Sequence, residues 1–227
     1  MKDLKACLAE MFGTFALVFV SIGAIFNANH QQMDLVGIAL AYGLATAAMV
    51  SATVAVSGGH LNPAVSFGAF LGGRMEFKQM ARYILAQLAG AVLAGFLCVT
   101  VFSTGVVSTA TPNLGKDVSI GAAILVEATL TFLLTFVMFG TTMDARGPKI
   151  GGLCVGLVVT AGVLFGQPLT GAAMNPARVF GPALVSGHFA NHAVYWIGPM
   201  LGAALAGLIY GRLLILPDEP PSVAKKR

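Results

Sequence analysis

The sequence predicts an all-α membrane protein with six transmembrane helices, two re-entrant half-helices and an inverted repeat. Three observations lead to this fold class. Apolar runs of about 20 residues recur along the chain, and the few charged residues fall mostly between them. Two shorter apolar runs each begin with Asn-Pro-Ala, and the two halves of the chain match one another at a nearly constant spacing.

The composition is that of a helical membrane protein that crosses the bilayer several times. Of 227 residues, 57% are hydrophobic and 10% are charged, and the mean hydropathy is +0.85. The net charge of +4 comes without a basic run outside the tail, so we expect no nucleic-acid partner. Cys7, Cys98 and Cys154 lie in apolar segments without metal-ligand spacing, which predicts buried thiols and no metal site.

Six runs are long enough to cross a bilayer as helices. We expect these spans at about 6–27, 35–56, 77–102, 119–141, 150–165 and 191–214. The first span has no obvious cleavage site, so we interpret it as part of the mature chain. Residues 103–118 form the longest polar link, and 217–227, with three prolines and a basic end, are expected to be a disordered tail. The whole chain, 1–227, is expected to form one domain.

The two halves of the chain, about 6–102 and 119–214, repeat one another. The Asn-Pro-Ala copies begin at Asn62 and Asn175, 113 residues apart, and Glu10 and Glu127 occur in similar contexts 117 residues apart. Each half carries three spans, so the second half enters the bilayer from the opposite side. Inverted repeats of this kind place the functional site near the midplane, where the broken helices meet.

The distribution of Lys and Arg predicts the orientation of the chain. Eleven of these residues fall on one side of the bilayer: Lys2, Lys5, Arg74, Lys78, Arg82, Arg146, Lys149, Arg212, Lys225, Lys226 and Arg227. The opposite side has Lys116 alone, with Arg178 set aside as a candidate pore residue. The positive-inside rule therefore predicts an even number of crossings and cytoplasmic termini.

The half-helices begin at Asn62-Pro63-Ala64 and Asn175-Pro176-Ala177 and are expected to end near residues 71 and 186. Proline suits the first helical position because its missing N–H would be unpaired there, and asparagine is a favourable cap. Each half-helix N-terminus carries about half a positive charge, and the inversion brings the two together at the bilayer centre. A single Asn-Pro would most simply be a helix cap, whereas two copies at the repeat spacing indicate a pore.

The segments that lead into the half-helices are expected to be non-helical and to line this pore, because irregular backbone is tolerated at membrane depth only beside protein or a cavity. Their residues are Gly58, Gly59, His60, Leu61, Gly171, Ala173 and Met174. Carbonyl acceptors along the path and two Asn donors at its centre suit a neutral molecule that donates and accepts hydrogen bonds. His60 fits either a gating group or a hydrogen-bonded structural histidine.

Three charged side chains fall inside apolar segments, where charge is costly without a partner or water. Arg178 follows the second box and fits a pore donor, with a helix-end arginine reaching the interface as the alternative. Glu10 and Glu127 lie in mid-span and are expected to brace the re-entrant segments by accepting backbone N–H bonds, with a proton relay as the alternative. Leu17 and Leu134, seven residues further on, fit either pore lining or packing.

These residues favour a passive channel over an enzyme. The sequence offers no nucleophile with an adjacent base, no phosphate-binding glycine loop and no metal cluster, so we expect neither catalysis nor a cofactor. The alternative is a secondary transporter or an ion channel built on the same inverted repeat. Such a transporter needs ionisable groups along its path, and Glu10, Glu127 and Arg178 are the only candidates.

The paired boxes, Arg178 after the second box, and glutamates in the first and fourth spans resemble the aquaporin, or major intrinsic protein, family over about residues 10–211. The resemblance implies six tilted helices and two half-helices that form one pore per subunit of a homotetramer. It also implies passive conduction of water or small neutral solutes through the lipid bilayer, exclusion of protons and ions, and no cofactor.

The resemblance further implies a selectivity filter outside the boxes. Counting from the two asparagines gives Tyr42, Val163, Ala172 and Arg178. Strict water channels have histidine at the position of Val163, so this constriction is expected to be wider and less polar. Glycerol facilitators typically carry aspartate after the arginine of the second box, where this chain has Val179.

The sequences that flank the boxes resemble the plant vacuolar-membrane branch of the family. That branch passes water, and some members pass ammonia, urea or hydrogen peroxide. We therefore expect water to pass together with a small neutral solute such as ammonia, urea, glycerol or hydrogen peroxide. The short loops and tails resemble prokaryotic members, which predicts a location in the cell membrane.

Overall fold

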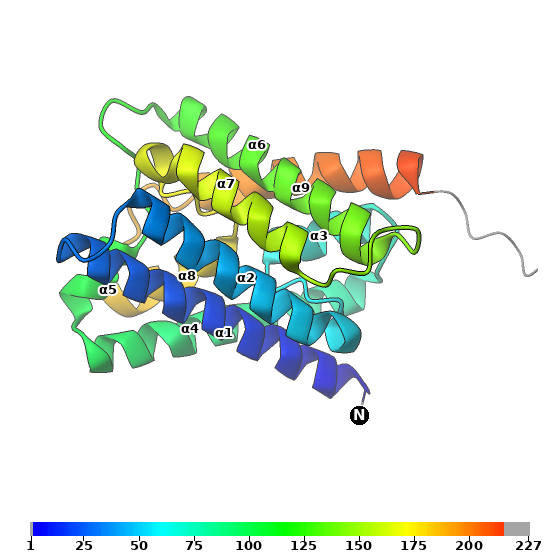
Figure 1. Cartoon of the computed structure of the whole chain (residues 1–227), viewed down its shortest axis with the longest axis horizontal. Helices are drawn as coiled ribbons and strands as arrows, with labels where there is room; N and C mark the ends of the chain where they lie inside the picture. The colour runs from blue at the N-terminus through cyan, green and yellow to red at the C-terminus, as the bar shows by residue number, and fades with distance from the viewer. Residues whose placement is uncertain (1, 216–227) are drawn as a thin grey trace, which may run out of the picture.

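The computed structural model describes residues 2–215, and this part of the chain is a bundle of helices (Figure 1). Six of the described helices are long and apolar enough to cross a membrane, which confirms the predicted fold class. The long helices are α1 (Lys2–Asn29), α2 (Leu35–Ser57), α4 (Phe77–Val101), α6 (Ile120–Met138), α7 (Leu153–Thr170) and α9 (Val194–Ala206). The π-helical segments η1 (Phe139–Met143) and η2 (Gly207–Leu214) continue α6 and α9.

The short helices α3 (Pro63–Leu71) and α8 (Pro176–Ser186) lie between the long ones (Figure 1). They contain 9 and 11 residues, so neither is long enough to cross a bilayer. Each begins with an asparagine cap and a proline in the first turn, as predicted. The Asn62 side chain accepts a bond of 2.8 Å from the Ala64 N–H, and Asn175 accepts one of 3.0 Å from the Ala177 N–H.

The helices pack as two matching sets that interlock. In the first half α1 packs on α4, and in the second half α6 packs on α9 in the same way. Each half-helix crosses to the other half, since α8 packs on α4 and α3 packs on α9. The half-helices are therefore held by both halves of the chain, and the segments that precede them meet inside the bundle.

Two features differ most from the sequence-based prediction. The link 103–118 contains a further short helix, α5 (Thr104–Ala110), which begins where the Ser103 hydroxyl accepts a bond from the Val106 N–H. The fifth span continues past the predicted end at residue 165 to Thr170, with Pro168 inside it. A proline near the end of a helix removes only one backbone bond, so this helix extends further than the sequence indicated. The predicted disordered tail, 217–227, lies outside the described residues.

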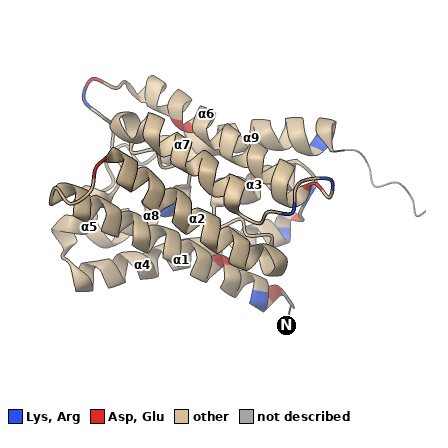
Figure 2. Ribbon diagram, in the orientation of Figure 1, with Lys and Arg blue, Asp and Glu red and all other residues tan. Residues whose placement is uncertain are grey.

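Lys and Arg gather at the end of the bundle where the chain begins and where its described part ends (Figure 2). At this end Arg146 pairs with Asp144 at 2.6 Å and also donates to the Leu214 carbonyl at 2.9 Å, which ties the turn after η1 to the end of η2. The hydrogen bonds from Arg146 lower the pKa of Asp144 to about 2, so this carboxylate is ionised at neutral pH. The gathering of positive charge at one end is the distribution on which the predicted orientation rests, and the cytoplasmic side of that end stays a prediction.

Candidate functional site

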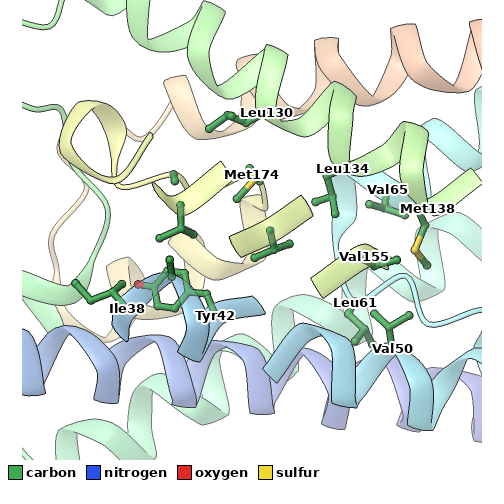
Figure 3. Packing of buried hydrophobic residues seen from close by; sticks show 14 of the residues in the cluster. Ile38, Tyr42, Val50, Leu61, Val65, Leu130, Leu134, Met138, Val155 and Met174 are labelled. Atoms are coloured by element: carbon green, nitrogen blue, oxygen red, sulfur yellow. The ribbon is translucent and has the colours of Figure 1, made fainter. Parts of the chain in front are cut away.

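A narrow cavity of about 50 Å³ lies between the N-termini of the two half-helices. This volume has room for roughly three to five water molecules. At one end the wall includes Tyr42 and Arg178, at the centre Asn62 and Asn175, and at the other end mostly apolar side chains. Figure 3 shows part of this wall, with Tyr42 well separated from the apolar group at the opposite end.

The two asparagines at the centre are held by bonds that cross between the halves of the chain. Asn62 donates from Nδ2 to the Met174 carbonyl at 2.7 Å, and Asn175 donates from Nδ2 to the Leu61 carbonyl at 2.9 Å. Each side-chain oxygen is meanwhile the cap of its own half-helix. An amide nitrogen has two hydrogens. One hydrogen of each asparagine is thus fixed by protein, and the other remains for a molecule in the cavity.

Glu10 braces the first re-entrant segment. Its carboxyl group accepts bonds from the backbone N–H groups of His60 at 3.0 Å and Leu61 at 2.6 Å. It also accepts from the Ser57 hydroxyl at 2.6 Å and the Gln87 amide at 2.7 Å. The side chain is fully buried, and all four partners are neutral donors.

Glu127 braces the second segment in the same way. It accepts from the backbone N–H groups of Ala173 at 2.9 Å and Met174 at 2.7 Å, and from the Thr170 hydroxyl at 2.6 Å. Neither glutamate belongs to the cavity wall. This geometry matches the predicted bracing role and gives no support to a proton relay along the cavity.

The braced segments hold three non-glycine residues in an unusual backbone conformation. Ala172 has a φ of 45°, and Leu61 and Met174, equivalent positions in the repeat, both have a φ of 51°. Side chains other than glycine rarely adopt this left-handed region, which costs about 1–3 kcal/mol per residue and persists only where the surroundings hold it in place. The N–H of Leu61 and of Met174 is bound to a glutamate, and the carbonyl of each to an asparagine. Both carbonyl oxygens are thereby fixed next to the cavity.

Arg178 is buried at one end of the cavity, with 7% of its surface exposed. It donates to the carbonyl oxygens of Gly171 and Ala172 at 3.2 and 3.3 Å, and to the Tyr42 hydroxyl at 2.6 Å. Its guanidinium carbon lies 4.4 Å from the centre of the Tyr42 ring. The arginine is therefore held inside the bundle by polar partners and does not extend to a membrane interface.

Several predicted wall residues lie behind the wall. Val163 is 0% exposed and packs in the same apolar cluster as Tyr42, but it is not a lining residue, because its short side chain is enclosed by that cluster. Gly58, Gly59 and Gly171 are not lining residues either. Gly58 and Gly171 instead end α2 and α7 in left-handed conformations, which glycine adopts at little cost. Pro63, Ala64, Pro176 and Ala177 are buried within the half-helices.

His60, Leu61, Ala172, Ala173 and Met174 do line the cavity, as predicted. The structure also bears on two open alternatives. Leu17 and Leu134 are wall residues, and the His60 ring is hydrogen-bonded at 3.1 Å to the Ser66 hydroxyl and packs edge-on against Tyr83.

Val65, which the repeat pairs with Arg178 and so places at the other pore mouth, also lines the cavity. Sequence reasoning missed six further lining residues, which are Ser21, Thr46, Val50, Met138, Val155 and Val159. Most of them could have been found from helical spacing, because they follow a predicted wall residue at intervals of four. Ser21 follows Leu17, Met138 follows Leu134, and Thr46 and Val50 follow Tyr42 in this way. Within residues 2–215 there is no group of His, Cys, Asp and Glu that could hold a metal ion.

Comparison with known proteins agrees with this architecture. The model of the family described as "Major intrinsic protein" matches residues 1–210. The chain is 42% identical to a probable aquaporin TIP3-2 of Arabidopsis thaliana, over 96% of this chain and 87% of that relative. It is 40% identical to the lens fiber major intrinsic protein of Ovis aries, over 92% and 81% of the two chains. The aquaglyceroporin of Plasmodium falciparum superposes with a TM-score of 0.84 at 25% identity, over 93% and 97% of the two chains.

The bracing bonds predict the effect of Glu10→Gln. Glutamine keeps one oxygen but replaces the other with an NH₂ donor, so at least one of the four donors around Glu10 loses its acceptor. We expect a loss of about 2–5 kcal/mol of stability and a lower unfolding temperature in detergent, followed by differential scanning fluorimetry. Glu76→Gln is the matched control, because Glu76 is exposed and makes no side-chain cap bond. Equal unfolding temperatures for the two variants would contradict the bracing role.

Proposed function

We infer from the fold and the site that this chain, which belongs to the major intrinsic protein family, is a passive membrane channel whose pore is the cavity between α3 and α8. The observation that carries this inference is the cross-bonded asparagine pair. Asn62 and Asn175 line the cavity at its centre, and each is oriented by a carbonyl of the opposite half.

We propose that the pair acts on a water molecule through its oxygen atom. A water at the centre accepts hydrogen bonds from the free amide hydrogens of both asparagines, so its own hydrogens point away along the pore. The adjacent carbonyls of Leu61 and Met174, and those beyond them, offer acceptors in both directions. A water whose oxygen is saturated with donors cannot accept a further proton from its neighbour, which interrupts proton transfer along the file.

Electrostatics support the exclusion of cations. Two half-helix N-termini, each with about half a positive charge, point at the same region, and Arg178 adds a full charge at one end of the cavity. The coupled-transporter alternative needs an ionisable group that reaches the permeant. Glu10 and Glu127 are bound to loop donors and lie behind the wall, so they do not meet this requirement.

The range of solutes follows from the end of the cavity that holds Tyr42, Ala172 and Arg178. We propose that these residues select for water and for small neutral solutes such as ammonia, urea, glycerol or hydrogen peroxide. Arg178 and the Tyr42 hydroxyl bind a polar molecule there, while Ala172 leaves more space than a larger residue would. The aquaglyceroporin among the similar structures supports including glycerol in the set.

We further propose a homotetramer with one pore per subunit, in the cell membrane, with cytoplasmic termini. The charge distribution supports the orientation (Figure 2). Relatives of the TIP type suggest a vacuolar-type membrane as the alternative, whereas the short links of this chain favour the cell membrane.

Liposomes containing the purified protein test this function. We expect them to shrink faster than empty liposomes in a sucrose gradient, measured by stopped-flow light scattering, because the pore adds a path for water. A pH-sensitive dye inside the same liposomes should report no added proton leak. Shrinkage at the rate of empty liposomes would refute the channel, and a proton or cation current that accompanies water would favour the ion-conducting alternative.

The filter assignment predicts the effect of Val163→His. An imidazole is longer and more polar than the valine side chain, so it would reach past the apolar cluster toward Tyr42 and Arg178. We expect urea and glycerol uptake to fall several-fold while water flux persists. Val158→His, on the same helix but facing a groove between α6 and α7, serves as the control. Unchanged urea and glycerol uptake in Val163→His would contradict the assignment of the filter to this end of the cavity.

A further inference from the structure

The repeat assigns every residue at the Arg178 end of the cavity a counterpart at the opposite end. The structure supplies the register, because equivalent residues make equivalent bonds. Ser57 and Thr170, 113 residues apart, each donate to a buried glutamate, which relates α2 to α7. Glu10 and Glu127, 117 residues apart, relate α1 to α6, and the two capping asparagines relate α3 to α8.

With this register the polar groups at one end correspond to apolar groups at the other. The pairs are Tyr42 with Val155, Arg178 with Val65, and Ser21 with Met138. All six residues line the cavity, so the correspondence holds for the wall itself. Both ends share the backbone scaffold, but in these three pairs only the residues at the Arg178 end have a side chain that can bind a polar molecule through hydrogen bonds, apart from the weakly polar sulfur of Met138.

Four apolar side chains cluster at the end of the cavity opposite Arg178. They are Val65, Met138, Val155 and Val50, the last being the counterpart of Val163, and we call these four residues the inner apolar ring. Figure 3 shows the four side chains near one another, with Leu61 beside them and Tyr42 far off. Each has an exposed fraction of 1% or 2%. They come from α2, α3, α6 and α7, so the ring encloses the path from several sides.

A polar molecule that passes this ring exchanges few hydrogen bonds with it. The polar side chain of the wall at this end is His60, whose Nδ1 is hydrogen-bonded to the Ser66 hydroxyl, which leaves its Nε2 for a permeant. Apart from this nitrogen, a permeant depends on the carbonyls of the first re-entrant segment. A polar group without its hydrogen bonds costs roughly 1–3 kcal/mol in a protein interior, so the ring resists entry of water more than the Arg178 end does.

We propose that the inner apolar ring is a second constriction, which sets the rate at which polar molecules cross the channel. The two ends of the cavity then have different roles, one in selecting the permeant and the other in setting the rate of its passage. The end with Arg178 and Tyr42 binds and discriminates the permeant, and the ring controls how fast it leaves or enters on the cytoplasmic side. This inference rests on the proposed channel function and adds to it a rate-determining element.

The test variants change the polarity of a side chain in the ring and keep its shape. Val155→Thr and Val50→Thr replace one methyl by a hydroxyl of similar size and give the permeant a hydrogen-bonding partner. In stopped-flow measurements on liposomes we expect water permeability per channel to rise roughly threefold to tenfold. Val155→Ile, which stays apolar and adds a methylene, should reduce it. Val158→Thr on the same helix is the matched control, because Val158 borders the groove between α6 and α7.

The outcomes separate this inference from the proposed function. If the wild-type protein conducts water but both threonine variants conduct it no faster than Val158→Thr, the rate-setting role of the ring is wrong and the proposed channel function is unaffected. Wild-type and all variants at the rate of empty liposomes would overturn the channel itself and the ring with it. Faster flux in the two threonine variants together with slower flux in Val155→Ile would support the ring. The protein content and melting temperature of each preparation are measured alongside, so that a folding defect is not counted as slow flux.

Discussion

Backbone hydrogen bonding at membrane depth is the constraint on which the rest of the structure depends. Two segments of this chain leave the helical conformation inside the bundle, and their N–H groups need acceptors from the protein behind the cavity wall. Glu10 and Glu127 accept those bonds, each serving two backbone N–H groups and a hydroxyl. A carboxyl group suits this task because it offers two oxygens and several acceptor directions from a single side chain.

The consequences extend from the glutamates to the centre of the pore. The glutamates bind the N–H groups of Leu61 and Met174, and these two residues keep a left-handed backbone conformation. This conformation turns the carbonyl of each residue toward the asparagine of the opposite half. Those carbonyls fix one hydrogen of each amide and leave the other for the permeant. Glu10 and Glu127 thus act on the permeant indirectly. They position the backbone of the re-entrant segments, and this backbone positions the asparagine side chains that contact the permeant.

Much of this was visible in the sequence because each element depends on local chemistry or on the repeat. The six spans follow from apolar length, the half-helices from an asparagine and a proline, and the bracing from charge in mid-span. The helix α5 was missed because its seven residues lie among the Ser, Thr and Gly of a polar link. The extension of α7 was missed because Pro168 normally marks a helix end. The position of Val163 behind the wall depends on how neighbouring side chains fill space, which neither periodicity nor a family resemblance reports. The inner ring was within reach, because the repeat spacing that pairs Asn62 with Asn175 also pairs Tyr42 with Val155.

We propose that the two asparagines, oriented across the repeat, hold a permeating water by its oxygen. An experimental structure at a resolution that shows ordered water tests this role most directly. We expect a file of water molecules through the cavity, with one water within hydrogen-bond distance of Nδ2 of both Asn62 and Asn175. A cavity whose ordered water stops on either side of the asparagine pair, or a pair whose amide hydrogens bind only protein atoms, would contradict it.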